Sequence, residues 1–369
     1  MFVEIELAIE TKNFDQAKIL IEKIPPQEEK HLWQNYYYGL IAEENNNIIE
    51  AEEKYRQVLK DSIFPNPNII KRIREGLGRI QNIKNLQKAQ EKQSLQQQKA
   101  DIFNKLKDHH NQDELAVLIL KPVSVDDKNN LAKNFAEILE LDIYTAKLQI
   151  PTRHWRLLKT GKWQELQSYY LMFERFSIPS FCYPIQAINT IQVYQVNYLE
   201  SFNDKISVIC ENKAQQVINF TVDINEVSSQ VEAMLPIFEM SLHTDTKGKL
   251  VRKKTTLDYI NFYDLHIKNQ NLIIRFNDNR YQFEQGNKNF LEAKTSREKW
   301  LSLTKFIQNN LSNITLYSDY TPFAESVVQF PKMLKQIDAK VQLFRKEETL
   351  WDEAFQLYSG VVFLGVDGN

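Results

Sequence analysis

The spacing of hydrophobic and polar positions changes along the chain, and each change predicts a different class of element. In residues 1–83 apolar residues recur three or four positions apart, the spacing of amphipathic helices. Residues 84–112 lose most apolar positions and are rich in glutamine, so we expect a solvated helical linker. From residue 190 apolar and polar residues alternate, as in strands with one buried face. The pattern predicts a multidomain α+β chain whose helices come first.

Residues 113–186 mix both spacings and predict a small α/β domain. The predicted strands are residues 115–120, 155–160 and 178–185, and the predicted helices are residues 125–141, 142–150 and 162–176. This β-α-α-β-α-β order resembles the C-terminal domain of the ribosomal stalk protein, in topology alone.

Residues 187–311 predict an antiparallel β-rich domain closed by one helix at 296–311. The predicted strands are residues 190–201, 205–212, 216–222, 249–257, 259–267, 271–278 and 280–285. Strands followed by one capping helix resemble a pleckstrin-homology-like barrel in architecture. The remaining segment, 312–369, predicts a helical extension that packs on the body. Its inward face is expected to hold Trp351, Ala354, Phe355 and Tyr358.

Residues 1–61 repeat a pattern of small and bulky positions at an offset of 34 residues. The equivalent pairs are Ala17 and Ala51, Ile21 and Tyr55, and Ile24 and Val58. The residues expected to pack the repeats are Ala17, Ile21, Tyr38, Gly39, Ala42, Ala51, Tyr55 and Val58. This spacing resembles the tetratricopeptide repeat (TPR) family, which implies pairs of antiparallel helices. The chain departs from the family at Asn35, where tryptophan is usual, and an ordinary helical hairpin without repeat ancestry is the alternative.

Gly39 is the least helix-favouring residue of this segment. Glycine inside a helix costs about 1 kcal/mol relative to alanine, so we expect a partner helix to fit closely against it. Asparagine readily adopts non-helical backbone angles, so Asn45–Asn47 predict the turn that follows. A closing helix is predicted at 69–83, with an apolar stripe of Ile69, Ile73, Leu77 and Ile80.

Over most of the chain, the order of domains is similar to uncharacterised TPR-containing proteins of cyanobacteria. The segments that carry this similarity are TPFAESVVQF, residues 321–330, and LWDEAFQLYSG, residues 350–360. The resemblance implies a lineage and no known reaction.

Composition narrows the setting in which the protein acts. Hydrophobic residues make up 43% of 369 residues, which is enough for packed cores. The formal net charge is −2, so we expect no nucleic acid among the partners. The chain has two cysteines, Cys182 and Cys210, which do not form a Cys-x-x-Cys pair. With no signal-like start and no apolar run of about 20 residues, we expect a cytoplasmic protein.

Charge is unevenly distributed within the helical part of the chain. Residues 1–61 hold 13 acidic against 7 basic residues, and residues 62–108 hold 4 acidic against 10 basic residues. Either the basic helix packs against the acidic repeats, or the two together form a docking face with an acidic part and a basic part.

The motifs of common enzymes are absent from the sequence, including phosphate-binding glycine loops and the nucleophile elbow of hydrolases. We therefore expect no catalytic residue, no cofactor and no metal. His109 and His110 are adjacent, and adjacent helical residues point about 100° apart, so they do not readily share one ion.

A second histidine constellation is the better metal candidate. His243 with Asp245, and Asp264 with His266, would converge if their strands pair suitably, because alternate residues share a face. Turn and strand-edge polarity explains the same residues without a metal.

The segment 247–254 concentrates positive charge. Its basic residues are Lys247, Lys249, Arg252, Lys253 and Lys254. Such a hairpin could attract anionic lipid or phosphate. Lysines that protect an exposed edge strand explain the same pattern.

These observations favour a non-enzymatic adaptor or assembly factor. The helical repeats would bind a protein partner, and the C-terminal domains would supply a second docking surface. The first alternative is a peripheral binder of anionic lipid or phosphate through residues 247–254. The second alternative is an enzyme with an unrecognised site. The sequence names neither the partner nor a small-molecule ligand.

Overall fold

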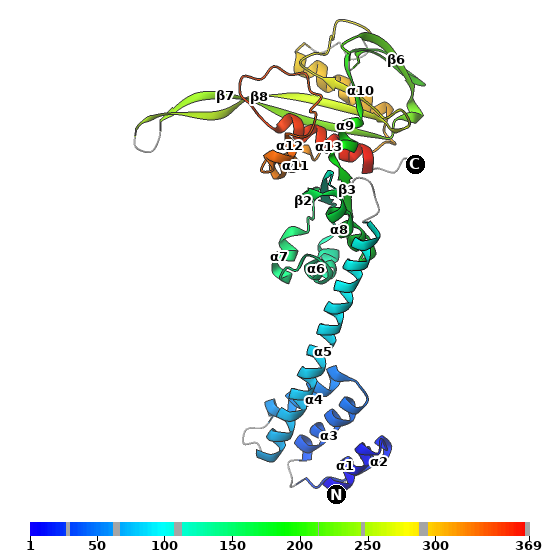
Figure 1. Ribbon diagram of the computed structural model, residues 1–369, viewed down its shortest axis with the longest axis vertical. Coiled ribbons are helices and arrows are strands. Elements are labelled where there is room, and N and C mark those ends of the chain that lie inside the picture. The colour runs from blue at the N-terminus through cyan, green and yellow to red at the C-terminus, as the bar shows by residue number, and fades with distance from the viewer. Residues whose placement is uncertain are drawn as a thin grey trace. The chain divides into compact units, whose positions relative to one another are not determined.

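The structure, a computed structural model, describes residues 1–26, 30–61, 67–106, 113–212, 214–244, 248–287 and 294–365 (Figure 1). The chain divides into two compact units, Met1–Gln98 and Lys99–Asn369. Helices come first and two sheets follow, so the expected mixed α+β class is confirmed. Within the described residues, none of the helices combines the length and the apolar character that crossing a bilayer requires.

The first unit consists of helical hairpins. Its helices are α1 (Phe2–Glu10), α2 (Phe14–Glu22), α3 (Lys30–Glu44), α4 (Ile48–Asp61) and α5 (Pro67–Leu106). The turns of the two hairpins are alike: Lys12 and Asn46, 34 positions apart, both have left-handed backbones with φ of 58° and 59°. In each turn the next residue, Asn13 or Asn47, accepts a backbone N–H with its side chain. The predicted turn at Asn45–Asn47 is confirmed, and the 34-residue offset recurs in the geometry.

Helix α5 closes the apolar interior of this unit. Ile69, Ile73 and Ile80 are buried there, as the predicted stripe requires. Its basic side chains form ion pairs with acidic residues of α1, α3 and α4: Arg72 with Glu6, Arg79 with Glu43, and Lys84 with Glu52. In these three pairs the basic residues of α5 neutralise acidic residues of the hairpins within the same unit.

The predicted closing helix and the helical part of the predicted linker are one continuous helix. α5 runs from Pro67 to Leu106, and its described side chains between residues 85 and 97 are exposed. The expectation of a solvated helix therefore holds for this stretch, while residues 107–112 lie outside the described residues.

The second unit begins with the small α/β fold. Strands β1 (Leu115–Leu120), β2 (Arg156–Lys162) and β3 (Ser180–Pro184) form an antiparallel sheet in the order β2-β1-β3. Helices α6 (Val125–Leu139), α7 (Ile143–Gln149) and α8 (Trp163–Arg175) fall between them in the predicted β-α-α-β-α-β order. Ser124 caps α6 by accepting the N–H of Asp127 at 3.1 Å.

A seven-stranded sheet follows, in the order β10-β7-β8-β9-β4-β5-β6. Its strands are β4 (Gln192–Phe202), β5 (Lys205–Glu211), β6 (Val217–Asp223), β7 (Ser229–Thr244), β8 (Leu250–Ile267), β9 (Leu272–Asn277) and β10 (Leu316–Tyr317). Short 3₁₀ helices lie at Ile224–Glu226 and Lys268–Gln270. The remaining helices are α9 (Ile185–Thr190), α10 (Ser296–Asn310), α11 (Tyr320–Val327), α12 (Pro331–Leu334) and α13 (Trp351–Gly365).

Three expectations for this sheet were wrong. The sheet is mixed and not antiparallel throughout, because β4 pairs parallel with β9 and β10 pairs parallel with β7. The two strands predicted at 249–257 and 259–267 are one long strand, β8, and its partner β7 was not predicted. Residues 280–285 are not a strand, because Arg280 and Tyr281 both donate their N–H groups to the Asn277 carbonyl and form a turn.

The two faces of this sheet are covered by different helices (Figure 1). On one face Trp300, Leu303 and Ile307 of α10 pack with Tyr263 and Leu265 of β8. On the other face α11, α12 and α13 pack with Phe262 of β8 and with Phe181 of the small sheet. Ala354, Phe355 and Tyr358 are buried in this second cluster, and Trp351 is partly buried beside them.

Candidate functional site

The most exposed feature of the second unit is the outer part of the β7–β8 hairpin (Figure 1). The strands bulge between Ile237 and Phe238, and they then continue as a two-stranded ribbon. We call residues 238–244 and 250–256 the arm. Nearer the core, residues 229–236 and 260–267 of the same strands are mostly buried. The arm is thus a projecting element with a buried base.

One face of the arm combines apolar and basic side chains. Met240 lies opposite Lys254, and Leu242 lies opposite Arg252, so each pair projects from the same face. Leu250, opposite Thr244, extends this row towards the tip. Met240, Leu242 and Leu250 are 46%, 66% and 72% exposed. We call these five residues the basic-apolar face, namely Met240, Leu242, Leu250, Arg252 and Lys254.

The opposite face of the arm is mostly polar. Ser241 Oγ lies 2.8 Å from Thr255 Oγ1 and 2.9 Å from His243 Nε2. These contacts join three polar side chains of this face within the arm itself. The two faces therefore differ in chemistry: the polar face exposes one apolar residue, Val251, whereas the basic-apolar face exposes Met240, Leu242 and Leu250.

The residues expected to bind an anion are distributed over both faces. Lys249, Arg252, Lys253 and Lys254 lie on or beside the arm, and Lys247 lies outside the described residues. Lys253 projects from the face opposite to Arg252 and Lys254. Lys254 Nζ donates to the Glu348 carbonyl at 2.5 Å and lies 4.7 Å from the Phe238 ring centroid. The positive charge therefore follows the strand and does not converge on one point.

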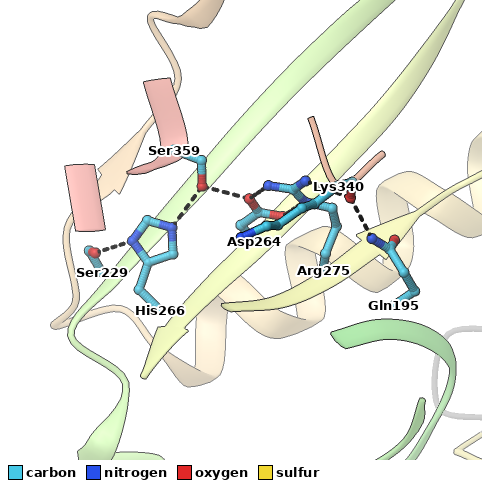
Figure 2. A network of polar contacts seen from close by, with 7 residues as sticks. All are labelled: Gln195, Ser229, Asp264, His266, Arg275, Lys340 and Ser359. Carbon is cyan, nitrogen blue, oxygen red and sulfur yellow. Dashed lines mark hydrogen bonds and ion pairs between the residues drawn. The ribbon is translucent and has the colours of Figure 1, made fainter. Parts of the chain in front are cut away.

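A buried ion pair holds the base of the arm (Figure 2). Arg275 of β9 donates from Nε and Nη2 to the two carboxylate oxygens of Asp264 in β8, at 2.8 and 2.7 Å. Both side chains are fully buried. The third guanidinium nitrogen donates to the Lys340 carbonyl at 3.1 Å, and Gln195 Nε2 donates to the same oxygen at 2.8 Å. The ion pair thus joins β8 and β9 to the segment before α13.

Two serines and a histidine extend this network to β7 and α13 (Figure 2). Ser359 of α13 donates to Asp264 Oδ2 at 2.7 Å. A hydroxyl has one proton, so Ser359 Oγ must accept from His266 Nε2, 3.0 Å away. His266 Nδ1 is then the acceptor for Ser229 Oγ at 2.8 Å. Burial lowers the pKa of His266 to about 3, so the ring is neutral.

This arrangement differs from a catalytic serine–histidine–aspartate relay. In such a relay the carboxylate orients the histidine, and the histidine accepts the proton of the serine. Here His266 does accept from a serine, Ser229, but the carboxylate does not hydrogen-bond to the histidine: Asp264 accepts from Ser359, and His266 donates to Ser359. Asp264, His266 and Ser359 are all fully buried. We therefore assign this network, which we call the anchor, to the structure of the arm's base.

Two surface cavities of the second unit lie away from the anchor. One, of about 450 Å³, is lined by Arg153, His154 and Arg156 together with Pro322 and Phe330. The other, of about 660 Å³, is lined by residues of β7, β8, the turn after β9 and the start of α10, including Met234, Asp258, Asn261, Asp278 and Arg297. Neither cavity is lined by a residue of the anchor, so a molecule bound in either would not reach its polar groups.

The candidate convergence of two histidine–aspartate pairs is not found for the residues that the structure describes. β7 and β8 pair, but His243 lies opposite Val251 near the tip, whereas Asp264 lies opposite Val231 at the base. Asp264 and His266 share a face as predicted, and they form part of the anchor. Asp245, His109 and His110 lie outside the described residues. In the part of the chain that the structure describes, no three metal-ligating side chains gather in one place.

The residues expected to pack the repeats lie in the interior of the first unit or at its margin. Ala17, Ile21, Ala51, Tyr55 and Val58 are fully buried. Gly39 and Ala42 are also buried. Tyr38 is half-buried, and its hydroxyl donates to Glu22 Oε1 at 2.8 Å.

Sequence reasoning missed two parts of this site. The basic segment was identified, but its apolar partner strand β7 was not. Arg275 and Ser359 were also not singled out. An arginine inside the apolar run LIIRF, residues 272–276, was the available signal, because a fully buried arginine requires a paired carboxylate.

Comparison of the chain with models of protein families, with curated proteins and with solved structures finds no match.

Proposed function

We propose that this chain is a non-enzymatic adaptor or assembly factor that binds a protein through the arm. The carrying observation is the basic-apolar face, where Met240, Leu242 and Leu250 remain exposed on a projecting ribbon. An isolated two-stranded ribbon is at best marginally stable in water, and burying its apolar face against another protein adds stability. Contact area of this kind contributes about 25 cal/mol per Å² of apolar surface.

The helical hairpins supply a second docking surface in this proposal. Their 34-residue offset, the repeated turn at Lys12 and Asn46, and the buried Ala17 and Ala51 support a TPR-like unit. Stacked helical pairs of that kind present a concave surface to a partner segment. An adaptor needs two separable surfaces, and the hairpins and the arm belong to different units of this chain.

The pleckstrin-homology-like assignment of the β-rich part stays a prediction. The packing of α10 on one face of the seven-stranded sheet supports it. The two parallel strand pairs depart from the expected antiparallel architecture.

Replacing the apolar row of the arm tests this proposal. The tagged chain would be expressed in its source cells, as wild type and as the variant Leu242→Glu with Leu250→Glu. The matched control, Ser241→Glu with Thr255→Glu, places the same charges on the opposite face. We expect a discrete co-purifying protein to be lost with the first variant and kept with the second. Equal recovery with both variants would overturn the proposal.

The anionic-lipid alternative has one observation in its favour. Leu242 and Arg252 lie opposite each other on one exposed face, and membrane-surface segments combine apolar and basic side chains in this way. Sedimentation of the chain with anionic vesicles at low salt, reversed by the same Leu242 and Leu250 variant, would support it.

A further inference from the structure

We infer that the outer edge of β8 in the arm takes up an acidic, extended segment of the partner protein by strand addition. This inference rests on the proposed function and names the chemistry of the partner. Strand addition places a peptide backbone against an unpaired strand edge and selects its sequence through alternate side chains.

The edge of β8 lacks a paired strand over residues 250–260, among the described residues. β9 pairs with β8 from Phe262 to Ile267, so among the described residues no strand pairs with residues 250–260 on the side away from β7. Residues 250–254 and 256–259 are exposed. Alternate residues of such an edge direct their backbone N–H and C=O groups outward, where they can pair with another chain.

The other edge of the hairpin is less suited to the same role. Beyond Val231, β7 is not paired to β10, but Arg345 Nη1 donates to the Pro236 carbonyl at 2.6 Å. Pro236 itself has no N–H to donate. An added strand therefore finds a longer unobstructed ladder along β8.

Charge determines which strand fits this edge. Arg252 and Lys253 are successive, so they flank an added strand on both of its faces. Neither has an acidic partner among the described residues. Like charges opposite each other destabilise a strand pair, so two copies of β8 repel when they align through these residues. The same charges attract a strand with acidic residues at the matching positions.

The neighbouring residues extend this pattern. Leu250 and Val251 precede Arg252 and Lys253, and both are exposed. A complementary strand therefore carries two successive apolar residues beside two successive acidic residues. The side chain of Lys254 already donates to the Glu348 carbonyl, so we do not include it in the pattern.

A direct binding measurement tests the inference. The probe is a short fluorescein-labelled peptide in which two glutamates are flanked on each side by two valines inside a threonine-rich sequence, so that either strand direction matches Leu250–Lys253. Fluorescence anisotropy with the full chain at low salt would report its affinity. We expect saturable binding by the native chain. We expect the affinity to fall by about tenfold or more after Arg252→Glu with Lys253→Glu. The matched control, Lys18→Glu with Lys332→Glu, makes the same change in net charge elsewhere and should leave the affinity unchanged.

Two peptide controls separate strand addition from charge attraction. The first replaces glutamate with lysine, and we expect it not to bind. The second keeps the charges but carries N-methyl groups on alternate backbone nitrogens, which removes donors of the ladder. We expect this peptide to lose binding. Equal affinity for the methylated and unmethylated peptides would overturn strand addition. This comparison uses the native chain, so it does not depend on whether the Arg252 and Lys253 variant folds.

The failure of this inference differs from the failure of the proposed function. If the peptide does not bind, but the Leu242 and Leu250 variant still loses a co-purifying protein, the adaptor stands and the acidic strand is wrong. Binding to vesicles of phosphatidylcholine and phosphatidylserine, without peptide binding, would also overturn the acidic strand and assign the edge to a membrane surface.

Discussion

The ring of Tyr55 occupies the space that a side chain at Gly39 would need. A Cβ atom at Gly39 would lie 2.7 Å from Tyr55 Cε1. Gly76 of α5 faces the other side of the same ring, where a Cβ atom would lie 2.7 Å from Tyr55 Cε2. The Tyr55 hydroxyl donates to Glu43 Oε2 at 2.7 Å and fixes the ring between the glycines. Three helices of the first unit therefore meet through one aromatic side chain.

Gly39→Ala should destabilise the first unit, and Gly39→Leu more so. Overpacking of a filled interior costs about 1–3 kcal/mol, which outweighs the helix propensity that alanine gains. Hydrogen exchange of α3 and α4 peptides would measure the loss.

Gly78→Ala is the matched control, because a Cβ atom at Gly78 meets no other atom within 4 Å. This substitution should stabilise α5 by about 1 kcal/mol through helix propensity alone. The two helical glycines are expected to respond in opposite directions, so the contact with Tyr55 is the cause that the comparison tests. Similar effects at both positions would rule that cause out.

Asp264→Ala should destabilise the second unit strongly. Removing one partner of a buried ion pair leaves the other charge uncompensated and costs about 3–5 kcal/mol. Urea unfolding followed by circular dichroism would measure the change. Replacing both partners, with Asp264→Leu and Arg275→Met, should recover part of the loss because no charge is then buried alone.

Glu211→Ala serves as the control for this prediction. Its ion pair with Arg280, at 2.9 Å, is partly exposed, and such pairs contribute about 0–1 kcal/mol. A loss as large as that for Asp264→Ala would show that ion pairing in general, and not the anchor, sustains this unit.

His266 should make the second unit less stable in mild acid. Burial lowers its pKa to about 3 from the usual 6.5. The unfolded chain takes up a proton below pH 6.5 and the folded chain does not, so this contribution is complete above pH 6.5 and is lost as the pH falls towards 3. His266→Asn should lower stability at neutral pH and reduce its decline in acid.

Urea unfolding at about pH 7.5 and about pH 5 would test this expectation. His243→Asn, on the exposed arm, is the control. It should leave the difference in the free energy of unfolding between the two pH values as it is in the native chain. A decline that is the same with and without His266 would assign the acid sensitivity to other groups.

Limited proteolysis should first cut the glutamine-rich stretch at residues 84–112. The described side chains between residues 85 and 97 are exposed, and segments with little burial open most easily. We expect a stable C-terminal fragment that begins near residue 110, identified by mass spectrometry. First cuts within residues 190–300 would contradict the proposed domain boundary.

The sequence pattern predicted those elements in which buried residues recur at a constant spacing along the chain. The apolar stripe of α5 and the inward face of α13 are examples, because helical spacing alone decides which side chains turn inward. β7 was missed because Pro236 interrupts its alternation. The proline is tolerated because, beyond Val231, none of the described strands pairs with the other side of β7, so no ladder bond is lost there.

The parallel pairs and the anchor could not be predicted in the same way. Arg275 and Asp264 lie on separate strands, and Ser359 comes from a helix 95 residues after Asp264. Which strands become neighbours depends on the packing of the whole unit, so composition and local period contain no direct signal for these contacts. The basic charges of the arm were visible in the sequence, but their separation onto two faces required the register of β7 with β8.

The long separation of Ser359 from its partners has a consequence for the order in which this unit can assemble. Ser359 lies 93 residues after His266 and 95 after Asp264. A chain emerging from the ribosome can pair β8 with β9 while Asp264 and Arg275 still face water on the α13 side. The hydroxyl that links the aspartate to the histidine is made only after every strand of the sheet. Synthesis from the N-terminus therefore allows the arm to form before α13 covers the polar groups at its base.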